Sequence, residues 1–338
     1  MLSFSTQSTH GLAMKQTQKT SAIDSIQLPS ALYTDPNVLE HELSECFINN
    51  WVSIAVGAQL PEPGDIYPLE VAGQSLLITR SEDKSLHVFN NICRHRGTTL
   101  VEAHCQRGNR LITCPYHTWS YTLEGKLVST PYWDRTADST PDAATRESLA
   151  LTPVRFAVWF DTIFVNISGA AEPFEEFIKP LSDYWATVDS LQLRPSMLKT
   201  DYRPRSNWKL VCENFLDGYH VPWVHSQVGS PEAGIDFLTA QYSEDIFGAY
   251  VPRGKSERPR SIQSLPGFTG LGDDLKNSHH FLYLFPNTLL GLAPEWFQVI
   301  SVFPQTPNTS SENLAFYVVG EEAFNSKHNE LREEYNKQ

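Results

Sequence analysis

The chain has 338 residues, with 26 Lys and Arg against 39 Asp and Glu, which gives a formal net charge of −13. This acidic balance argues against nucleic acid as a partner, because phosphate binding needs a basic face. No run of about 18 or more apolar residues occurs, so we expect no membrane-spanning helix and no membrane partner. The five cysteines are an odd number in a long chain, which argues against a secreted disulfide framework.

Residues 1–27 are predicted to form a flexible tail. Up to residue 23 they contain no Asp or Glu and are rich in Ser, Thr and Gln. They lack the apolar stretch of roughly 7–15 residues that a secretory signal needs. An organelle transit peptide is an alternative, but such peptides carry arginines and this segment has none. We therefore predict a cytoplasmic enzyme with reduced thiols.

From residue 28 the pattern is that of a folded protein. Asp35 precedes apolar residues at helical spacing, which predicts a capped helix ending near Phe47. Short strand-like runs and turn signals then alternate, which indicates a small β-domain. The predicted strands cover 76–79, 86–89, 111–113, 119–123 and 126–128, and a further pair lies within 154–167.

After Pro173 the pattern changes to a mixture of helices and strands. Helices are predicted over 174–188 and 208–219, and the polar segment 325–337 is also helix-prone. Strand-like runs cover 280–285, 289–291, 297–303 and 314–319. This half therefore has an α+β pattern, with strands lying together and helices around them.

Two short loops each combine one Cys with one His. Cys93 and His95 are followed, after 18 intervening residues, by Cys114 and His117. The first pair is spaced more closely than the pairs of zinc fingers, although a structural zinc site is the alternative. Two thiolates on one iron and two imidazoles on the other describe a two-iron cluster, whose reduction potential is raised by the neutral ligands. Cys105 has no partner at ligand spacing and is interpreted as a bystander.

A second group of possible ligands follows in the predicted helix 208–219. Glu213, Asp217 and His220 fall at i, i+4 and i+7, which places them on one helical face. His225 lies five residues further on, and Pro222 between the two histidines predicts a kink that could bring both imidazoles to one metal. Two histidines and a carboxylate are the ligands of mononuclear Fe(II) sites that leave positions open for oxygen. The alternative is a helix with a paired Asp217 and two incidental histidines.

These motifs resemble those of the Rieske-type non-haem iron oxygenases, specifically the terminal oxygenase (alpha) subunit of the aromatic ring-hydroxylating and choline monooxygenase-like group. The resemblance rests on residues 93–97, 114–119 and 207–225, and Phe285-Pro286-Asn287 also looks like a strand turn of the family. It implies an α+β fold with a β-sandwich Rieske [2Fe-2S] domain over 50–165. A catalytic domain with a twisted antiparallel sheet flanked by helices would comprise 28–49 and 166–338.

The resemblance also implies a role for each matching residue. His220 and His225 would ligate the catalytic Fe(II). Asp217 looks like the carboxylate that links the Rieske histidine of one subunit to the iron histidine of its neighbour, which implies a homotrimer. The ligands of the [2Fe-2S] cluster would be Cys93, His95, Cys114 and His117.

The implied chemistry is oxygen activation at Fe(II), with electrons from NAD(P)H delivered by a separate ferredoxin or flavin reductase. The substrate would be a small aromatic or quaternary ammonium compound that is hydroxylated or demethylated. Trp223, Trp296 and Phe297 are either an aromatic face for a cation or part of the core. Some quaternary ammonium enzymes of the family carry a bridging glutamate where this chain has Asp217, so the substrate class stays open.

The sequence departs from the family at the third iron ligand. That ligand is an aspartate on a C-terminal helix, and no Asp follows Asp274. Glu330, Glu333 and Glu334 lie near the end without a matching pattern. We expect that the sequence ends before the helix that carries this aspartate, although a glutamate could replace it. The alternatives are an incomplete, non-catalytic relative and a Rieske electron-transfer protein, which would need the first group of ligands alone.

Overall fold

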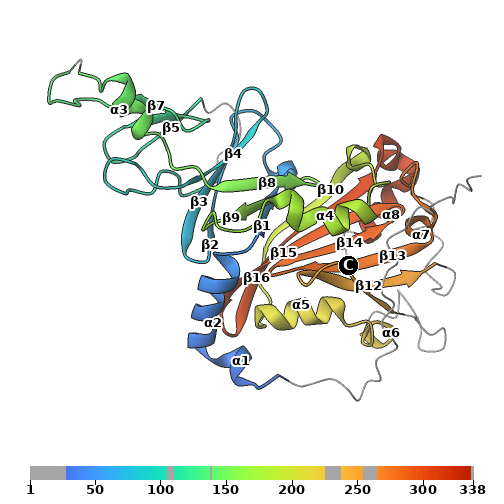
Figure 1. Cartoon of the computed structure of the whole chain (residues 1–338). Helices are drawn as coiled ribbons and strands as arrows, with labels where there is room; N and C mark the ends of the chain where they lie inside the picture. The colour runs from blue at the N-terminus through green and yellow to red at the C-terminus, as the bar shows by residue number, and fades with distance from the viewer. Residues whose placement is uncertain (1–27, 105–109, 138, 225–236, 254–264, 336–338) are drawn as a thin grey trace, which may run out of the picture.

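A computed structural model of the chain describes residues 28–104, 110–137, 139–224, 237–253 and 265–335. Its largest element is a seven-stranded antiparallel sheet with the strand order β10-β16-β15-β14-β13-β12-β11 (Figure 1). We call it the C-terminal sheet. Its strands are β10 (Leu193–Tyr202), β11 (Leu238–Gln241), β12 (Ile246–Pro252), β13 (Ser278–Leu284), β14 (Thr288–Ala293), β15 (Trp296–Thr306) and β16 (Thr309–Val319).

Three small antiparallel sheets precede it and form the N-terminal unit. A tight turn at Gly125, with φ of 83°, connects β6 to β7 where the Glu-Gly dipeptide predicts one. A Cβ at this position would lie 2.6 Å from the Phe89 ring, so glycine also permits close packing. The sheets are β1 (Val52–Val56), β9 (Thr162–Asn166) and β8 (Arg155–Trp159); β2 (Ile66–Val71), β3 (Gln74–Arg80) and β4 (Leu86–Asn90); and β5 (Leu111–Thr113), β6 (Ser120–Thr122) and β7 (Leu127–Ser129). Together with the C-terminal sheet they confirm the predicted α+β class.

The helices are short and cover the sheets. Asp35 caps α2 by accepting a hydrogen bond from the Asn37 N–H at 2.9 Å, as predicted. Within the described ranges, no helix combines the length and apolar character needed to cross a bilayer. The α-helices are α1 (Ala31–Thr34), α2 (Pro36–Glu42), α3 (Ala143–Ser148), α4 (Phe174–Tyr184), α5 (Trp208–Leu216), α6 (Val221–Val224), α7 (Asp273–Lys276) and α8 (Asn329–Tyr335).

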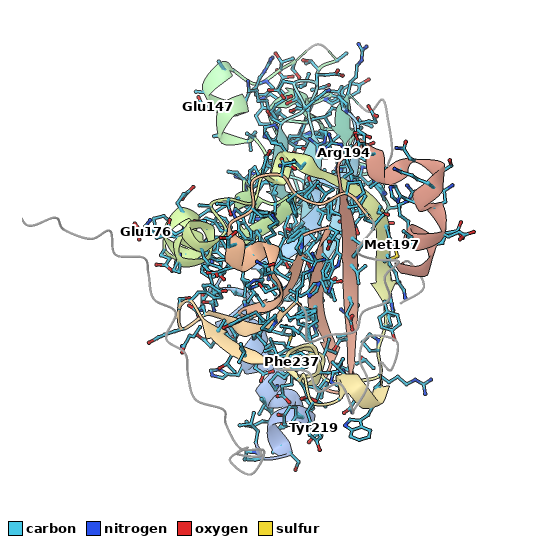
Figure 2. The ribbon with its side chains drawn as sticks, turned by 90° about the vertical axis from the view of Figure 1, so that its right-hand side faces the viewer. Glu147, Glu176, Arg194, Met197, Tyr219 and Phe237 are labelled. Atoms are coloured by element: carbon cyan, nitrogen blue, oxygen red, sulfur yellow. The ribbon has the colours of Figure 1, made fainter. Side chains whose placement is uncertain are left out.

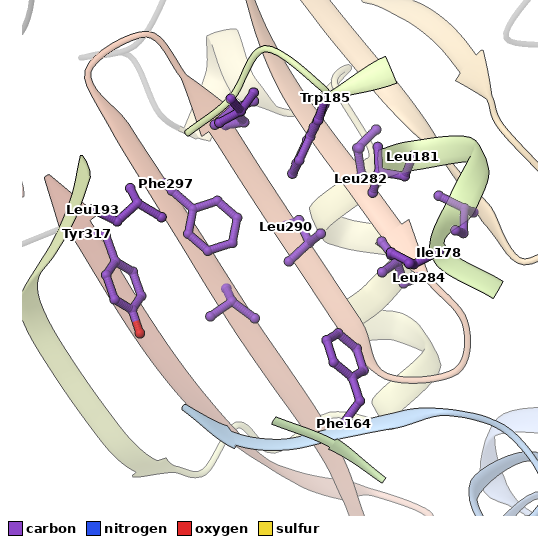
Figure 3. Packing of buried hydrophobic residues seen from close by; sticks show 14 of the residues in the cluster. Phe164, Ile178, Leu181, Trp185, Leu193, Leu282, Leu284, Leu290, Phe297 and Tyr317 are labelled. Carbon is purple, nitrogen blue, oxygen red and sulfur yellow. The ribbon is translucent and has the colours of Figure 1, made fainter. Parts of the chain in front are cut away.

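Helices α4 and α5 lie on opposite faces of the C-terminal sheet (Figure 1). On the first face, α4 buries Ile178 and Leu181 against Leu282 and Leu284 of β13 (Figure 3). On the second face, α5 packs on β13 and β15. Residues that follow one another in a strand point to opposite faces, so each strand supplies both cores.

This alternation corrects the predicted aromatic face. Trp296 and Phe297 are both buried, but they belong to different hydrophobic clusters on the two sides of β15. Trp223 is exposed. The three rings therefore share no surface, and the core interpretation is confirmed for Trp296 and Phe297.

The N-terminal helices hold α5 in place through polar contacts. Glu42 of α2 accepts a hydrogen bond from Trp208 Nε1 at 2.9 Å and pairs with the ammonium of Lys209. Tyr33 donates its hydroxyl proton to the Glu213 carboxylate at 2.7 Å, which raises the pKa of Tyr33 to about 12. The start and middle of α5 are thus fixed by residues 166 and 180 positions earlier in the chain.

His280 should make the stability of the protein depend on pH. The residue is fully buried under α4, and its Nε2 is hydrogen-bonded to Ser278 Oγ at 2.7 Å. Burial lowers the pKa of His280 to about 4. As the pH falls from about 6.5, the unfolded chain binds a proton here that the folded chain refuses until about pH 4. Stability therefore falls with pH across that window, by roughly 3 kcal/mol at most from this residue.

Urea unfolding at pH 6.5 and pH 4.5 measures this dependence. The His280→Gln variant should lose less stability than the wild type between the two pH values, because it has no group to protonate at this position. Equal losses in the two proteins would show that His280 does not contribute.

Candidate functional site

Two loops of the N-terminal unit carry the predicted cluster ligands and have the same backbone hydrogen bonds. The N–H of Cys93 donates to the Thr98 carbonyl at 2.8 Å, and the N–H of Gly97 donates to the Cys93 carbonyl at 3.0 Å. The second loop has the same two bonds. The Cys114 N–H donates to the Trp119 carbonyl at 2.8 Å, and the Thr118 N–H donates to the Cys114 carbonyl at 3.1 Å. Gly97 and Thr118 have the same left-handed conformation, with φ of 72° and 57°. The sequence thus builds one loop twice, at the ends of two strands.

The two thiols and the two imidazoles of these loops differ in their exposure to solvent. The Cys93 and Cys114 thiols are buried, whereas His95 and His117 are exposed. The two imidazole rings lie 4.7 Å apart between centroids, and the Trp119 ring stacks on His95 at the same distance. Burial and the neighbouring Cys114 thiol raise the pKa of Cys93. Two inner thiols and two outer imidazoles fit a [2Fe-2S] cluster with one pair on each iron.

A single zinc ion would require all four groups to converge on one point. Across the part of the chain that the structure describes, no three His, Cys, Asp or Glu side chains converge in this way. A two-iron cluster needs two protein ligands on each iron, which the two thiols and the two imidazoles can supply.

Tyr121 lies against one of the thiols and is a residue that the sequence analysis missed. Its hydroxyl oxygen lies 3.5 Å from Cys93 Sγ and accepts the Arg94 N–H at 3.2 Å. Because the oxygen already accepts a hydrogen bond from the backbone N–H of Arg94, the O–H is free to donate a hydrogen bond to the sulfur. Burial, followed by this contact, raises the pKa of Tyr121, which keeps the hydroxyl protonated.

Removing this hydroxyl should lower the reduction potential of the cluster. Hydrogen bonds to the sulfurs stabilise the reduced, more negative state, and Tyr121→Phe deletes one of them. Redox titration followed by electron paramagnetic resonance measures the potential. Tyr132→Phe is the matched control, since Tyr132 is exposed. An unchanged or higher potential in Tyr121→Phe would contradict the assignment.

The second predicted site has a different backbone from the one expected. Helix α5 ends at Leu216, and Asp217 is extended, with φ of −75° and ψ of 106°. The predicted face with Glu213, Asp217 and His220 at helical spacing is therefore wrong. The chain leaves the helix well before Pro222, at Asp217-Gly218, a turn dipeptide whose signal the sequence analysis did not use.

Asp217 and His220 nevertheless meet. Asp217 Oδ1 accepts the Tyr219 N–H at 2.8 Å, which closes the turn, and Oδ2 lies 3.2 Å from His220 Nδ1. Gly218 is required here, because a Cβ would lie 2.1 Å from the Phe237 ring. A carboxylate on Nδ1 selects the tautomer in which Nε2 is the basic nitrogen, the arrangement common to metal-bound histidines.

Among the described residues, the remaining carboxylate candidates Glu213, Glu330 and Glu333 do not form a metal-binding group with this pair. Glu213 is hydrogen-bonded to Tyr33. His225 lies outside the described residues, as does Cys105. Glu330 and Glu333 are exposed on α8. The described structure therefore contributes the Asp217–His220 pair to the predicted iron site, and the other ligands stay predictions.

Comparison with known families accounts for both halves of the chain. Residues 50–143 match the Rieske [2Fe-2S] domain, and residues 195–338 match the catalytic domain of ring hydroxylating alpha subunits. The chain belongs to the Rieske-type non-haem iron oxygenases. Its similarity to curated members extends over nearly its whole length, as the following relatives show.

The oxygenase subunit of carnitine monooxygenase from Escherichia coli K12 is 29% identical over 301 residues, covering 87% of this chain and 75% of the relative. Chloroplastic choline monooxygenase from Amaranthus tricolor is 26% identical over 311 residues, covering 89% and 65%. The quaternary ammonium Rieske monooxygenase CntA bound to gamma-butyrobetaine superposes with a TM-score of 0.70 at 22% identity, covering 91% of this chain and 79% of CntA. Naphthalene 1,2-dioxygenase with bound indole superposes with a TM-score of 0.66 at 21% identity, covering 89% of this chain and 73% of the dioxygenase chain. These superpositions establish the shared fold.

The candidate cluster loops, which follow β4 and β5, and the Asp217–His220 pair, which lies between α5 and α6, are at opposite ends of the molecule (Figure 1). Helix α3, which contacts the first cluster loop through Arg94, ends the molecule on one side. Figure 2 shows Glu147 of that helix and Tyr219 of the turn after α5 at the two extremes. The figure agrees with the separate hydrophobic cores: Cys93 and Cys114 belong to one cluster, and Cys212 of α5 belongs to another.

Both ends expose aromatic surface. Tyr116, Tyr132 and Trp133 lie exposed beside or near the cluster loops. At the other end Tyr219 and Trp223 flank His220 and are 77% and 66% exposed. Exposed apolar groups that lie together mark contact surfaces more often than apolar side chains that are scattered singly.

Proposed function

We propose that this Rieske oxygenase is the oxygenase component of a monooxygenase that hydroxylates a small quaternary ammonium compound. The observation that carries the proposal is its similarity to carnitine and choline monooxygenases across most of the chain. One turnover converts a substrate C–H bond, O2, two electrons and two protons into a C–OH bond and water. Hydroxylation next to a quaternary nitrogen weakens the C–N bond, so demethylation or chain cleavage would follow.

Two metal groups would serve this reaction. Cys93, His95, Cys114 and His117 would hold the [2Fe-2S] cluster, which accepts and passes single electrons. His220 and His225 would hold Fe(II), which supplies the oxygen-activating site. Within this chain, Asp217 would orient the His220 ring and stabilise the tautomer that presents Nε2.

A homotrimer is proposed because the two candidate centres of one chain are far apart in the fold (Figure 2). Electrons would pass from the cluster of one subunit to the iron of its neighbour. The half-exposed Asp217 carboxylate, with 49% of its side chain accessible, is available to a neighbouring histidine. The exposed aromatic groups at both ends would be covered by that contact. A separate reductase would deliver electrons from NAD(P)H to the cluster.

Turnover with defined compounds tests the proposal. The purified protein, combined with a reductase and NADH, should consume O2 with L-carnitine, choline or gamma-butyrobetaine and release an oxidised product. Naphthalene, of similar size but uncharged, is the control and should give no product. If naphthalene is oxidised and none of the three quaternary ammonium compounds is, the proposed substrate class is wrong. The oxygenase assignment would remain in place.

A further inference from the structure

A buried asparagine connects the two halves of the molecule. Asn287 lies between β13 and β14, in the Phe-Pro-Asn sequence, and Ser53 lies in β1; neither is exposed. The Ser53 N–H donates to Asn287 Oδ1 at 3.0 Å, and Asn287 Nδ2 donates to the Ser53 carbonyl at 2.9 Å. One side-chain amide thus satisfies both backbone groups of a strand residue. We call this pair the amide bridge.

The position of β1 explains why an amide is needed. In the sheet order β1-β9-β8, β1 is an edge strand, so one side of its backbone has no neighbouring strand. That side is buried at Ser53, where unpaired N–H and C=O groups would be costly. Among short side chains, Asn alone offers a neutral donor and a neutral acceptor on two separate atoms of one planar group, as the N–H and C=O of Ser53 require.

Hydroxyl groups complete the contact. Ser53 Oγ lies 2.7 Å from Ser301 Oγ and accepts the Thr288 hydroxyl proton at 2.8 Å. All four residues have less than 4% of their surface exposed. A fully satisfied polar network in a buried position is rigid and favours one arrangement of the groups around it.

The amide bridge joins the N-terminal unit, which carries the cluster loops, to the C-terminal sheet, on which α5 packs. On one side, β1 shares a hydrophobic cluster with Leu76 and Ile78 of β3, and Thr79 donates its hydroxyl proton to the Leu123 carbonyl at 2.6 Å beside the cluster loops. On the other side, Asn287 leads into β14, the central strand of the C-terminal sheet.

We propose that Asn287 is a positioning residue for electron transfer. It fixes the orientation of the cluster-bearing N-terminal unit on the C-terminal sheet, and therefore where the cluster of each subunit meets the iron of the next. This inference rests on the proposed function. Electron transfer falls with distance, so a displaced cluster passes its electron more slowly. For catalysed reactions in general, a misplacement near 1 Å caused by a remote substitution can cost about 10²-fold in rate.

Stopped-flow oxidation of the reduced cluster tests the role. The cluster is reduced beforehand, mixed with O2 and L-carnitine or choline, and followed by its absorption as each cluster gives up one electron. Asn287→Ala should keep the cluster spectrum, reduction potential and iron content of the wild type but oxidise at least about tenfold more slowly. An Asn287→Ala protein that oxidises at the wild-type rate would overturn the inference.

A matched control separates position from general damage. Asn313 also accepts a backbone N–H, that of Asp201 at 3.1 Å, but within the C-terminal sheet. Asn313→Ala should oxidise as the wild type does; an equal slowing would show that any lost amide has the same effect and would overturn the role of Asn287. If Asn287→Ala does not retain its metals, Asn287→Ser, which leaves room for a bridging water, is judged by the same criteria.

The wild-type protein distinguishes failure of this inference from failure of the proposed function. A wild-type protein without a Rieske signal, or whose reduced cluster is not oxidised on mixing, refutes the proposed function whatever the variants do. Rapid oxidation in the wild type and in Asn287→Ala alike refutes the role of Asn287 alone.

Discussion

Replacing Asp217 by Ala should abolish turnover while leaving the cluster intact. The carboxylate is the group that orients His220, through the 3.2 Å contact at Nδ1. Loss of such a partner behind a metal-bound histidine typically costs 10–100-fold in affinity or activity. If Asp217 also bridges to a neighbouring subunit, the electron path is lost too, so we expect a decrease of about 10²-fold or more.

The measurement is steady-state O2 consumption together with the cluster signal. Asp183→Ala is the control, because Asp183 is similarly exposed, at 43%, and pairs with Lys179 on the surface of α4. This variant should retain wild-type turnover. Turnover of Asp217→Ala close to that of the wild type would rule out the bridge and the orienting role together.

Replacing Cys114 by Ser should remove the [2Fe-2S] cluster and, with it, all turnover supported by a reductase. The thiol is buried, it lies in one of the two matching loops, and its neighbour Cys93 shares the same hydrophobic cluster. A serine hydroxyl is a much weaker ligand for this iron than a cysteine thiolate. Iron content should fall by about two per chain, and the visible absorption of the cluster should disappear.

Cys46→Ser provides the comparison. Cys46 is partly buried beside a different hydrophobic cluster, and burial, with nearby Glu42 and Glu45, raises the pKa of its thiol. It therefore stays protonated, and its substitution should leave cluster and turnover unchanged. A Rieske signal that survives in Cys114→Ser but not in Cys46→Ser would reverse the ligand assignment.

Local patterns in the sequence predicted the loops and most of the strands. Alternating apolar residues and the Glu-Gly turn depend on neighbours along the chain, and the structure has β3 to β7 where these patterns are found. The pairing of each Cys with a His two or three positions later is equally local. The structure brings all four side chains into the same part of the N-terminal unit.

Features that depend on tertiary contacts were predicted less well. Helical spacing placed Asp217 inside α5, although its carboxylate bonds to the Tyr219 N–H and ends the helix there. The amide bridge could not be predicted from the Phe-Pro-Asn sequence, because its partner Ser53 lies 234 residues away. Tyr121 was missed for the same reason, since its hydroxyl reaches Cys93 from another strand.

Metal analysis, together with electron paramagnetic resonance of the reduced protein, shows whether this chain combines a Rieske cluster with a mononuclear iron. We expect about three irons per chain and the signal of a [2Fe-2S] centre with two histidine ligands. About two irons with that signal would indicate a cluster without the catalytic iron, as in an electron-transfer protein or an incomplete oxygenase. Bound zinc, or the lack of such a signal after reduction, would rule out the Rieske cluster in this chain.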